Sequence, residues 1–284
     1  MWAAGWAPRR YGRGGATLVM VASEFGEPAC LLDLLKEPVL AVQEFVVLAG
    51  RAFRNIFRKP HYLDDVILQM DTIGVGSLVV VVLVGLFSGI VMALQMARAL
   101  AQYGEVEKTG TLVAITLARE LGPVLTAIMM AGRNSSGIAS ELGSMKVTEQ
   151  IDAMRALGTD PIQKLVTPRL EATCFMLPLL TVIADFVGLF GGWVISVVKL
   201  HLTSRLYWNS AWQALEWNDV AQGLIKPLVF AVVVSLIGCF YGLRTTGGTQ
   251  GVGRSTTQAM VAATIMIFIT DVMITEFFVS QGVS

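Results

Sequence analysis

Residues 74–97 form the uncharged stretch GVGSLVVVVLVGLFSGIVMALQMA. An α-helix needs about 20 predominantly apolar residues to cross the hydrocarbon core of a bilayer. Four further apolar stretches of similar length follow, at 111–132, 173–198, 220–241 and 257–279. Because backbone polar groups in lipid have to be satisfied within their own segment, we expect five spanning helices and an all-α integral membrane fold.

The overall composition agrees with this fold class. Hydrophobic residues make up 54% of the 284 residues, charged residues only 15%, and the mean hydropathy is +0.65. The formal net charge is zero and no basic block indicates a nucleic-acid partner. Two histidines and three widely separated cysteines provide little material for a metal site or a disulfide framework. We therefore expect no metal and no cofactor bound by this chain.

The N-terminal part divides into two segments. Residues 1–32 contain Arg9, Arg10 and Arg13 without a full apolar core and cleavage site, so we predict a poorly ordered extension and no cleaved signal peptide. Residues 33–60 place apolar side chains at helical spacing and end in basic residues, which predicts an amphipathic helix broken near Pro38. Such a helix suits the membrane surface, and packing against a partner protein is the alternative. Residues 61–284 form the membrane domain.

Lysine and arginine in the short loops predict the orientation of the spans. The basic residues before the first span and between the second and third spans mark the cytoplasmic side; they are Arg51, Arg54, Arg58, Lys59, Lys146, Arg155, Lys164 and Arg169. The loops at 102–110 and 199–219 lack such an excess and belong outside. The second of these loops is rich in tryptophan, which favours interfacial anchoring over a short surface helix. The N-terminus is then cytoplasmic and the C-terminus lies on the opposite side.

The cytoplasmic segment between the second and third spans predicts a short helix. Residues 141–168 read ELGSMKVTEQIDAMRALGTDPIQKLVTP, in which Thr148 is a suitable cap and Gly158 a suitable end. Ile151, Met154 and Leu157 recur at three-residue spacing. A compact helix here suits the transmission of a rigid-body movement from a soluble motor to the spans. A plain interhelical loop is the alternative.

Five charged residues lie well inside the spans, away from their ends: Arg119, Glu120, Asp185, Lys226 and Asp271. Each costs about 2.5–3.5 kcal/mol at a helix centre, so each needs a partner or a function. Adjacent residues are about 100° apart on an α-helix, so Arg119 and Glu120 are expected to meet different helices. Lys226 is the expected partner of Glu120, and Asp271 that of Arg119. Asp185 is singled out by its position alone.

One glycine-rich stretch imitates a phosphate-binding loop. Residues 248–255 read GTQGVGRS, which has P-loop spacing with arginine in place of lysine. A true P-loop follows a buried strand and opens a helix. Here the stretch joins two membrane spans, so we expect a tight connection and no nucleotide site.

Several long motifs resemble the MlaE/YrbE family of ABC permeases. They are RELGPVLTA at 119–127, GRNSSGIASELGSMKVTEQIDAMRALGTDP at 132–161, LPLLTVIADFVGLFGG at 177–192, LIKPLVF at 224–230 and STTQAMVAATIMIFITDVMIT at 255–275. The resemblance covers nearly all of residues 40–280 and leaves the first 30 or so residues unmatched. It implies a homodimeric permease in the bacterial inner membrane that moves phospholipid to or from a periplasmic MCE-domain carrier. It also implies a separate cytoplasmic ABC ATPase that binds the ATP, accompanied in Gram-negative systems by a small STAS-domain protein.

The resemblance also assigns residues. It places the lipid cavity around Arg119, Glu120, Lys226 and Asp271, with Gln95 and Asp185 as possible further members. It makes the short helix the element that couples to the ATPase, through Glu149, Gln150, Ile151, Asp152, Ala153, Met154, Arg155 and Leu157. The charged residues either meet a lipid headgroup or form structural pairs between spans.

Two other classes of protein compete with this interpretation. Intramembrane Asp, Glu and Lys also serve ion-coupled secondary transporters, which usually show internal repeats that we do not detect here. A lipid-modifying membrane enzyme would need a nucleophile and a base in proximity, and the chain lacks G-x-S-x-G, H-E-x-x-H and CxxC motifs.

Overall fold

The computed structural model of the chain describes residues 28–56, 58 and 62–280, which contain helices and no strand. The chain divides into two units between Val46 and Val47. The α-helices, in order, are α2 (Pro28–Ile56), α3 (Leu63–Ala101), α4 (Thr109–Thr116), α5 (Gly122–Met130), α6 (Ser136–Val147), α7 (Gln150–Ala156), α8 (Thr167–Leu200), α9 (Ser204–Ala214), α10 (Trp217–Leu243) and α11 (Gly248–Ser280). A 3₁₀ turn η1 (Val106–Lys108) and three π-helical segments, η2 (Leu117–Leu121), η3 (Ala131–Ser135) and η4 (Ile162–Val166), complete the described part.

Within the described residues, five helical stretches are long and apolar enough to cross a membrane, as many as the apolar stretches predicted. They are Leu63–Ala101, Val106–Val147, Ile162–Leu200, Trp217–Leu243 and Gly248–Ser280. Each is longer than the apolar stretch that predicted it, because polar turns continue the helix at one or both ends. At a rise of about 1.5 Å per residue, the longest exceed the roughly 30 Å hydrocarbon core.

The predicted amphipathic segment is a single helix, α2, that runs through Pro38 instead of breaking there. A proline removes one backbone donor, and the neighbouring turns of a long helix hold the axis across that gap. α2 begins at Pro28, inside the predicted extension, whereas residues 1–27, 57 and 59–60 of the predicted N-terminal segments lie outside the described residues. Its location at a membrane surface stays a prediction.

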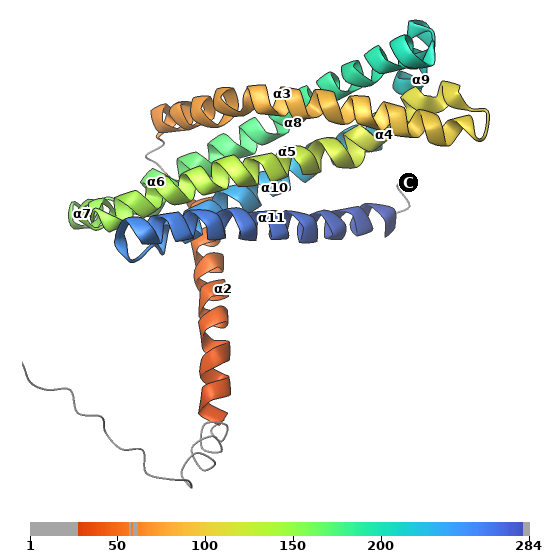
Figure 1. Ribbon diagram of the computed structural model, residues 1–284. Coiled ribbons are helices and arrows are strands. Elements are labelled where there is room, and N and C mark those ends of the chain that lie inside the picture. Colours follow the sequence, from red (N-terminus) through yellow and green to blue (C-terminus); the bar gives the residue numbers. More distant parts are fainter. Residues whose placement is uncertain (1–27, 57, 59–61, 281–284) are drawn as a thin grey trace, which may run out of the picture. The chain divides into compact units, whose positions relative to one another are not determined.

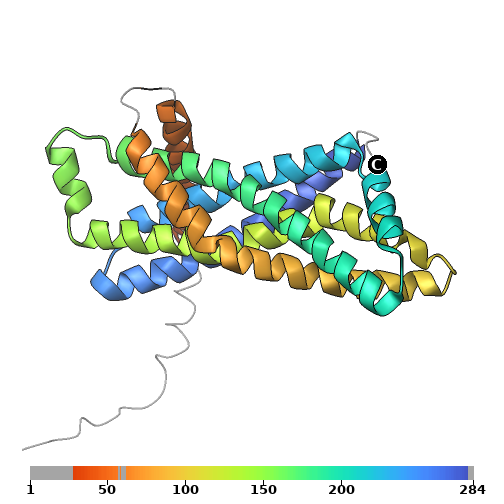
Figure 2. The same ribbon diagram turned by 90° about the horizontal axis from the view of Figure 1, so that it is seen from above.

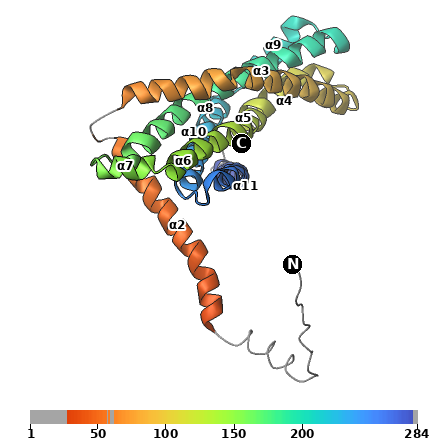
Figure 3. The same ribbon diagram turned by 60° about the vertical axis from the view of Figure 1, so that its left-hand side comes forward.

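The helices of the second unit form an elongated bundle (Figure 1). α3 and α8 run side by side and parallel along much of it (Figure 2). α11 packs against α10 and α6 (Figure 3). The second span is composite, because α4, η2, α5, η3 and α6 follow one another without a break.

Small residues let α3 and α8 approach at backbone distance. A Cβ atom on Gly89 would lie 1.9 Å from the carbonyl oxygen of Gly188, and one on Gly85 would lie 2.7 Å from that of Ala184. Such contacts are typical of membrane helices, where association depends on close van der Waals packing. The α3–α8 pair is therefore a rigid wall for the remaining spans.

The two ends of the bundle carry different short helices (Figure 1). At one end α9 packs on α4, with the Thr111 hydroxyl donating to the Ser210 carbonyl at 3.1 Å. Tyr207 of α9 is fully buried, and its hydroxyl donates to the Leu189 carbonyl at 3.2 Å. This segment is therefore a docked helix, whereas the aromatic side chains alone favoured interfacial anchoring. At the other end lies α7.

We expect Gly89→Ala to loosen the α3–α8 contact, because the new methyl group has no room beside the Gly188 carbonyl. Overpacking a tight contact costs typically 1–3 kcal/mol. The measurement is the unfolding temperature of the purified chain in detergent, which should fall by several degrees. Gly137→Ala is the matched control, because nothing lies within 4 Å of a Cβ at Gly137. Equal unfolding temperatures for the two variants would contradict this packing.

Candidate functional site

A fully buried ammonium group lies at the centre of the predicted cavity residues. Lys226 of α10 is 0% exposed, and its Nζ lies 2.7 Å from Glu120 Oε2 and 2.9 Å from Asp271 Oδ1. Nζ also donates to the Thr275 hydroxyl at 2.9 Å. Two of the three donors of the ammonium group are therefore hydrogen-bonded, to Glu120 and Thr275, and Asp271 adds a second opposite charge as an ion pair. The predicted Lys226–Glu120 pair is confirmed.

The predicted Arg119–Asp271 pair is wrong. Arg119 Nε instead donates to Asp219 at the start of α10, and Asp271 turns to Lys226. Asp219 and Lys226 are seven residues apart, so they lie on the same face of α10 two turns apart. α10 therefore partners both Arg119 and Glu120, and α11 supplies the second carboxylate for Lys226.

A π-helical segment allows two adjacent residues to meet one neighbouring helix. Arg119 and Glu120 lie in η2, whose i→i+5 hydrogen bonding places more residues in each turn than an α-helix does. Between the two ion pairs, α10 comes close enough that a Cβ on Gly223 would lie 2.9 Å from the Ala118 carbonyl. The expectation that Arg119 and Glu120 face different helices assumed regular α-helical geometry, which η2 does not have.

The ion pairs of Arg119, Glu120, Asp219, Lys226 and Asp271 form one charged cluster. Parts of Arg119 and Glu120 in this cluster stay accessible to a ligand. Lys226 is fully buried between two carboxylates, whereas the side chains of Arg119 and Glu120 are 28% and 38% exposed. Arg119 uses Nε for Asp219, and none of its other N–H groups has a protein partner among the described residues. An anion can therefore meet Arg119, and a cation can meet Glu120. Lys226 and Asp271 hold the helices that position these two groups.

Asp219 is a residue that the sequence analysis missed. From sequence it belongs to the end of the outer loop, because the apolar stretch of the fourth span begins at Val220. Its seven-residue spacing from Lys226 was the available signal. The structure places Asp219 in the first turn of α10, where it is fully buried and its carboxylate also accepts from the Glu216 backbone N–H at 3.0 Å.

The two further candidates form none of the ion pairs of the charged cluster. Gln95 is exposed on α3. Asp185 of α8 packs against the Cα of Gly122, and its Oδ1 is buried without a hydrogen-bond partner. Asp185 also lines an apolar pocket between α8, α9 and α10, together with Ala118, Phe186, Trp212, Asp219 and Leu224. This pocket therefore shares Asp219 with the charged cluster.

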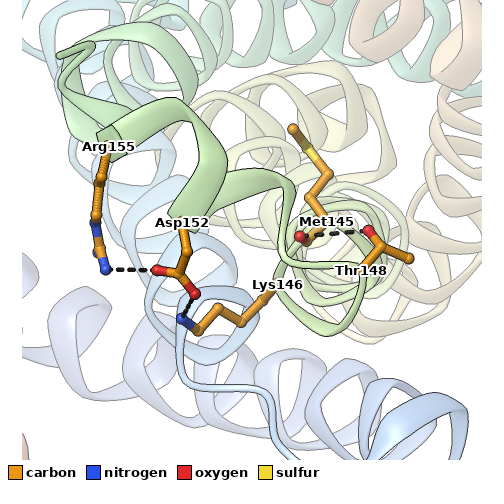
Figure 4. A network of polar contacts seen from close by, with 5 residues as sticks. All are labelled: Met145, Lys146, Thr148, Asp152 and Arg155. Atoms are coloured by element: carbon orange, nitrogen blue, oxygen red, sulfur yellow. Dashed lines mark hydrogen bonds and ion pairs between the residues drawn. The ribbon is translucent and has the colours of Figure 1, made fainter. Parts of the chain in front are cut away.

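The predicted coupling segment is a short helix held on the end of α6 (Figure 4). Lys146 Nζ lies 2.7 Å from Asp152 Oδ2, and Arg155 Nη1 lies 3.0 Å from Asp152 Oδ1. The hydrogen bond from Lys146 lowers the pKa of Asp152, so this contact is complete at neutral pH and is lost as the pH falls through that lowered pKa. Ile151 is buried, which adds an apolar anchor.

The boundaries of α7 differ in detail from the prediction. The Thr148 hydroxyl donates back to the Ser144 carbonyl at 2.9 Å, so it closes α6 and does not cap α7. Glu149 takes the N-cap position in a left-handed conformation with φ of 59°, which costs strain in a residue other than glycine. Gly158, with φ of 79°, follows the helix end as predicted.

One face of α7 is free within this chain. Met154 is half-buried, and Gln150, Ala153 and Arg155 are exposed. Leu157 is 83% exposed just beyond the end of the helix. Exposure thus increases along the three apolar residues of this segment: Ile151 is buried, Met154 is half-buried and Leu157 is exposed. A rigid helix that presents an apolar side chain beside charges is suited to contact another protein.

The glycine-rich stretch at residues 248–255 is helical. Gly247 and Gly248 have φ of 87° and 68° and make the turn after α10, and the remaining residues form the first turns of α11. The sequence analysis expected the whole stretch to be a connection. No strand precedes it in the described part of the chain, so the P-loop context is missing.

Comparison with known proteins identifies the relatives of the chain. The family described as "Permease MlaE" matches residues 66–277. A "Probable ABC transporter permease protein" of Rickettsia felis is 42% identical over 238 residues, which cover 84% of this chain and 92% of that protein. The "Intermembrane phospholipid transport system permease protein MlaE" of Haemophilus influenzae is 33% identical over 249 residues, 85% of this chain and 95% of that protein.

A plant relative extends the comparison. The protein "TRIGALACTOSYLDIACYLGLYCEROL 1, chloroplastic" of Arabidopsis thaliana is 37% identical over 232 residues, which cover 82% of this chain and 66% of that protein. The matched residues in the family comparison include η2, α7, α10 and most of α11, so the charged cluster and the coupling segment both lie in the shared region.

We expect Lys226→Met to destabilise the bundle, because Glu120 and Asp271 would be left close together without their cation. Removing one partner of a buried ion pair costs about 3–5 kcal/mol. The unfolding temperature in detergent should fall strongly, and the triple variant Lys226→Met, Glu120→Gln, Asp271→Asn should recover much of the loss. An unfolding temperature of the single variant equal to that of the parent protein would show that the ammonium group is not needed.

Proposed function

Because the chain belongs to the permease MlaE family, we propose that it is the membrane subunit of an ABC transporter that moves phospholipid. The observation that carries this proposal is the charged cluster inside the bundle, which leaves Arg119 and Glu120 partly exposed between spans. In this proposal a periplasmic MCE-domain protein exchanges the lipid, and a separate cytoplasmic ATPase binds and hydrolyses the ATP.

The chemistry of the cluster suits a phospholipid headgroup. The free N–H groups of Arg119 favour a phosphate, which guanidinium groups bind through charge-assisted hydrogen bonds. The partly exposed carboxylate of Glu120 favours an amine, such as that of an ethanolamine headgroup. The neighbouring apolar pocket between α8, α9 and α10 offers a surface for acyl chains. Lys226 acts as a positioning residue, since its ammonium group is fully buried and contacts Glu120, Asp271 and Thr275 within the protein.

α7 suits the transmission of movement from the ATPase. Its anchors, Ile151 and the Lys146–Asp152 contact, tie it to α6, which continues through η3 and α5 to η2. A displacement of α7 can therefore reach Arg119 and Glu120 along one continuous span. The exposed Leu157, together with the exposed polar side chains of α7, forms the proposed docking surface for the ATPase.

The charge distribution supports an orientation in the bacterial inner membrane. Lys146, Arg155 and Lys164 lie at or near the α7 end of the bundle, which we place in the cytoplasm with the N-terminus. The α9 end and the C-terminal end of α11 then face the periplasm and the MCE-domain protein. We further propose that the permease works as a homodimer, with a small STAS-domain protein accompanying the ATPase. The names of the Haemophilus and Rickettsia relatives support the transport of phospholipid and the ABC mechanism.

We expect Arg119→Gln combined with Asp219→Asn to reduce lipid transfer about tenfold or more while the protein still accumulates. The double variant removes the charge that meets a phosphate, worth about 1.5–3 kcal/mol, and keeps neutral partners at both positions. The assay measures transfer of labelled phospholipid from proteoliposomes with the complete complex to the carrier protein.

Arg98→Gln on α3 is the control, because Arg98 is exposed and makes none of the ion pairs of the charged cluster. Normal transfer by the double variant would remove Arg119 from the lipid site. Transfer that proceeds without ATP and follows an imposed proton gradient would instead favour an ion-coupled secondary transporter.

We expect Leu157→Asp to abolish binding of the ATPase subunit without unfolding the bundle, because the side chain is exposed in this chain. The measurement is co-purification of the ATPase together with its ATP turnover. Leu157→Met should keep both, and Tyr103→Asp, an exposed position near the α9 end, should keep both as well. Retention of a coupled ATPase by Leu157→Asp would contradict docking at α7.

A further inference from the structure

A second pocket, with several polar side chains in its lining, lies between α3 and the inner part of the second span. Its lining includes Gln69, Thr72 and Ser77 from α3, with Arg133, Asn134 and Glu141 from η3 and α6. Arg133 is a charged residue of a π-helical segment that takes no part in the cluster around Lys226. It lies fourteen residues after Arg119, about 21 Å along a helix axis at 1.5 Å per residue. The two sites are therefore separate.

The guanidinium group of Arg133 lies across the surface of α3. A Cβ on Gly76 would be 2.5 Å from Arg133 Nη2 and 3.2 Å from its Cζ, so a side chain at this position would push the exposed guanidinium group away from α3. Arg133 has no ion pair or side-chain hydrogen bond among the described residues. An unpaired arginine in a membrane span is costly, which makes it a candidate for binding a ligand.

The other polar groups of the pocket show which charge it accepts. Ser77 is 3% exposed, and its hydroxyl has no partner within the described chain. The Thr72 hydroxyl already donates to the Leu68 carbonyl, and the Asn134 amide donates to the Thr173 hydroxyl. Glu141 is engaged by Arg169 at 2.8 Å. The donors without a partner among the described residues are thus the Arg133 N–H groups, the Ser77 hydroxyl and the Gln69 amide, and together they favour an anion beside the Arg169-paired Glu141.

The surroundings of the pocket identify the source of that anion. Thr72 is exposed on α3, and Val75 and Val79 continue the same side of this helix with more than 60% of their surface exposed. These side chains belong to a spanning helix, where an exposed apolar face meets acyl chains. We propose that this pocket binds the phosphate group of a membrane phospholipid, with Arg133 and Ser77 as its donors and the acyl chains along α3.

This proposal does not depend on transport, because it concerns a pocket lined by α3, η3 and α6 that is separate from the charged cluster. An arginine that only reaches toward water would need neither the space at Gly76 nor the buried Ser77 hydroxyl. The two explanations differ in a measurable way. A phosphate site is saturable and selective, whereas a solvated arginine leaves the surrounding lipid unselected.

The experiment uses the purified full chain in a maltoside detergent, which contains no phosphate. Phosphatidylethanolamine with a photoreactive group near the start of one acyl chain is added and activated, and the labelled peptides are mapped by mass spectrometry. We expect adducts on α3 around residues 72–79 that excess unlabelled phosphatidylethanolamine removes. Diacylglycerol, which lacks the phosphate, and soluble glycerophosphoethanolamine, which lacks the chains, should both fail to compete.

Three variants test the residues. Arg133→Gln should lower the adduct yield on α3 about tenfold, since a charge-assisted contact is lost. Gly76→Ala should lower it several-fold, because the methyl group displaces the flexible end of Arg133. Gly132→Ala is the matched control with nothing within 4 Å of its Cβ, and its yield should equal that of the parent protein.

Several outcomes would overturn the proposal. An unchanged yield in Arg133→Gln, or competition by diacylglycerol as strong as that by phosphatidylethanolamine, would mean that ordinary surrounding lipid was labelled. Effective competition by glycerophosphoethanolamine would mean a site for soluble phosphates. If the adducts on α3 form on the monomer but not on the dimer, this face of α3 belongs to the dimer interface, and the proposal is wrong. Loss of the adduct in Arg133→Gln with normal lipid transfer would still support the site, because the proposed transport function rests on Arg119.

Discussion

The ammonium group of Lys226 has to be neutralised and hydrogen-bonded, because it is buried in a spanning helix. It contacts oxygens from two other spans: it hydrogen-bonds Glu120 on η2 and Thr275 on α11, and it forms an ion pair with Asp271 on α11. The packing of α10 between the second and fifth spans follows from this requirement. In lipid, apolar side chains gain little by leaving their surroundings, so such polar contacts specify which helices meet. The Arg119–Asp219 pair adds a second fixed point two turns away.

The π-helical segments accompany the charged chemistry of this bundle. η2 carries Arg119 and Glu120, η3 carries Arg133, and η4 carries Lys164, which pairs with Asp65 of α3. A π turn is rare because its hydrogen bonding is less favourable, and it persists where the neighbouring structure compensates for it. In η2 the compensation is visible, since two adjacent side chains both form ion pairs with one face of α10. In the second span, the irregular backbone of η2 thus accompanies the pairing of both Arg119 and Glu120 with α10.

The short helices at the two ends of the bundle are each fixed to a spanning helix, so a movement of a short helix also moves its span. At one end, the Lys146–Asp152 contact and buried Ile151 hold α7 on α6. At the other, buried Tyr207 holds α9 against α4 and α8. Between them the glycine contacts of α3 and α8 form a wall with little freedom to deform. The proposed transport cycle therefore moves whole helices about the charged cluster and does not bend them locally.

The amino-acid sequence by itself determined the five spans, the short helix after the second span and the identity of the buried charges, because the bilayer imposes length and hydropathy on a segment regardless of its neighbours. It also predicted the Lys226–Glu120 pair from opposite charge alone. Only the tertiary structure decided that Arg119 meets Asp219, since this depends on the π turn of η2 and on the position of Asp219 inside α10. The same holds for Leu157 and Arg133, whose exposure and free donors depend on helices distant in the sequence. A local sequence pattern shows that a charged residue lies in lipid and needs a partner. Which residue becomes that partner depends on how the spans pack together.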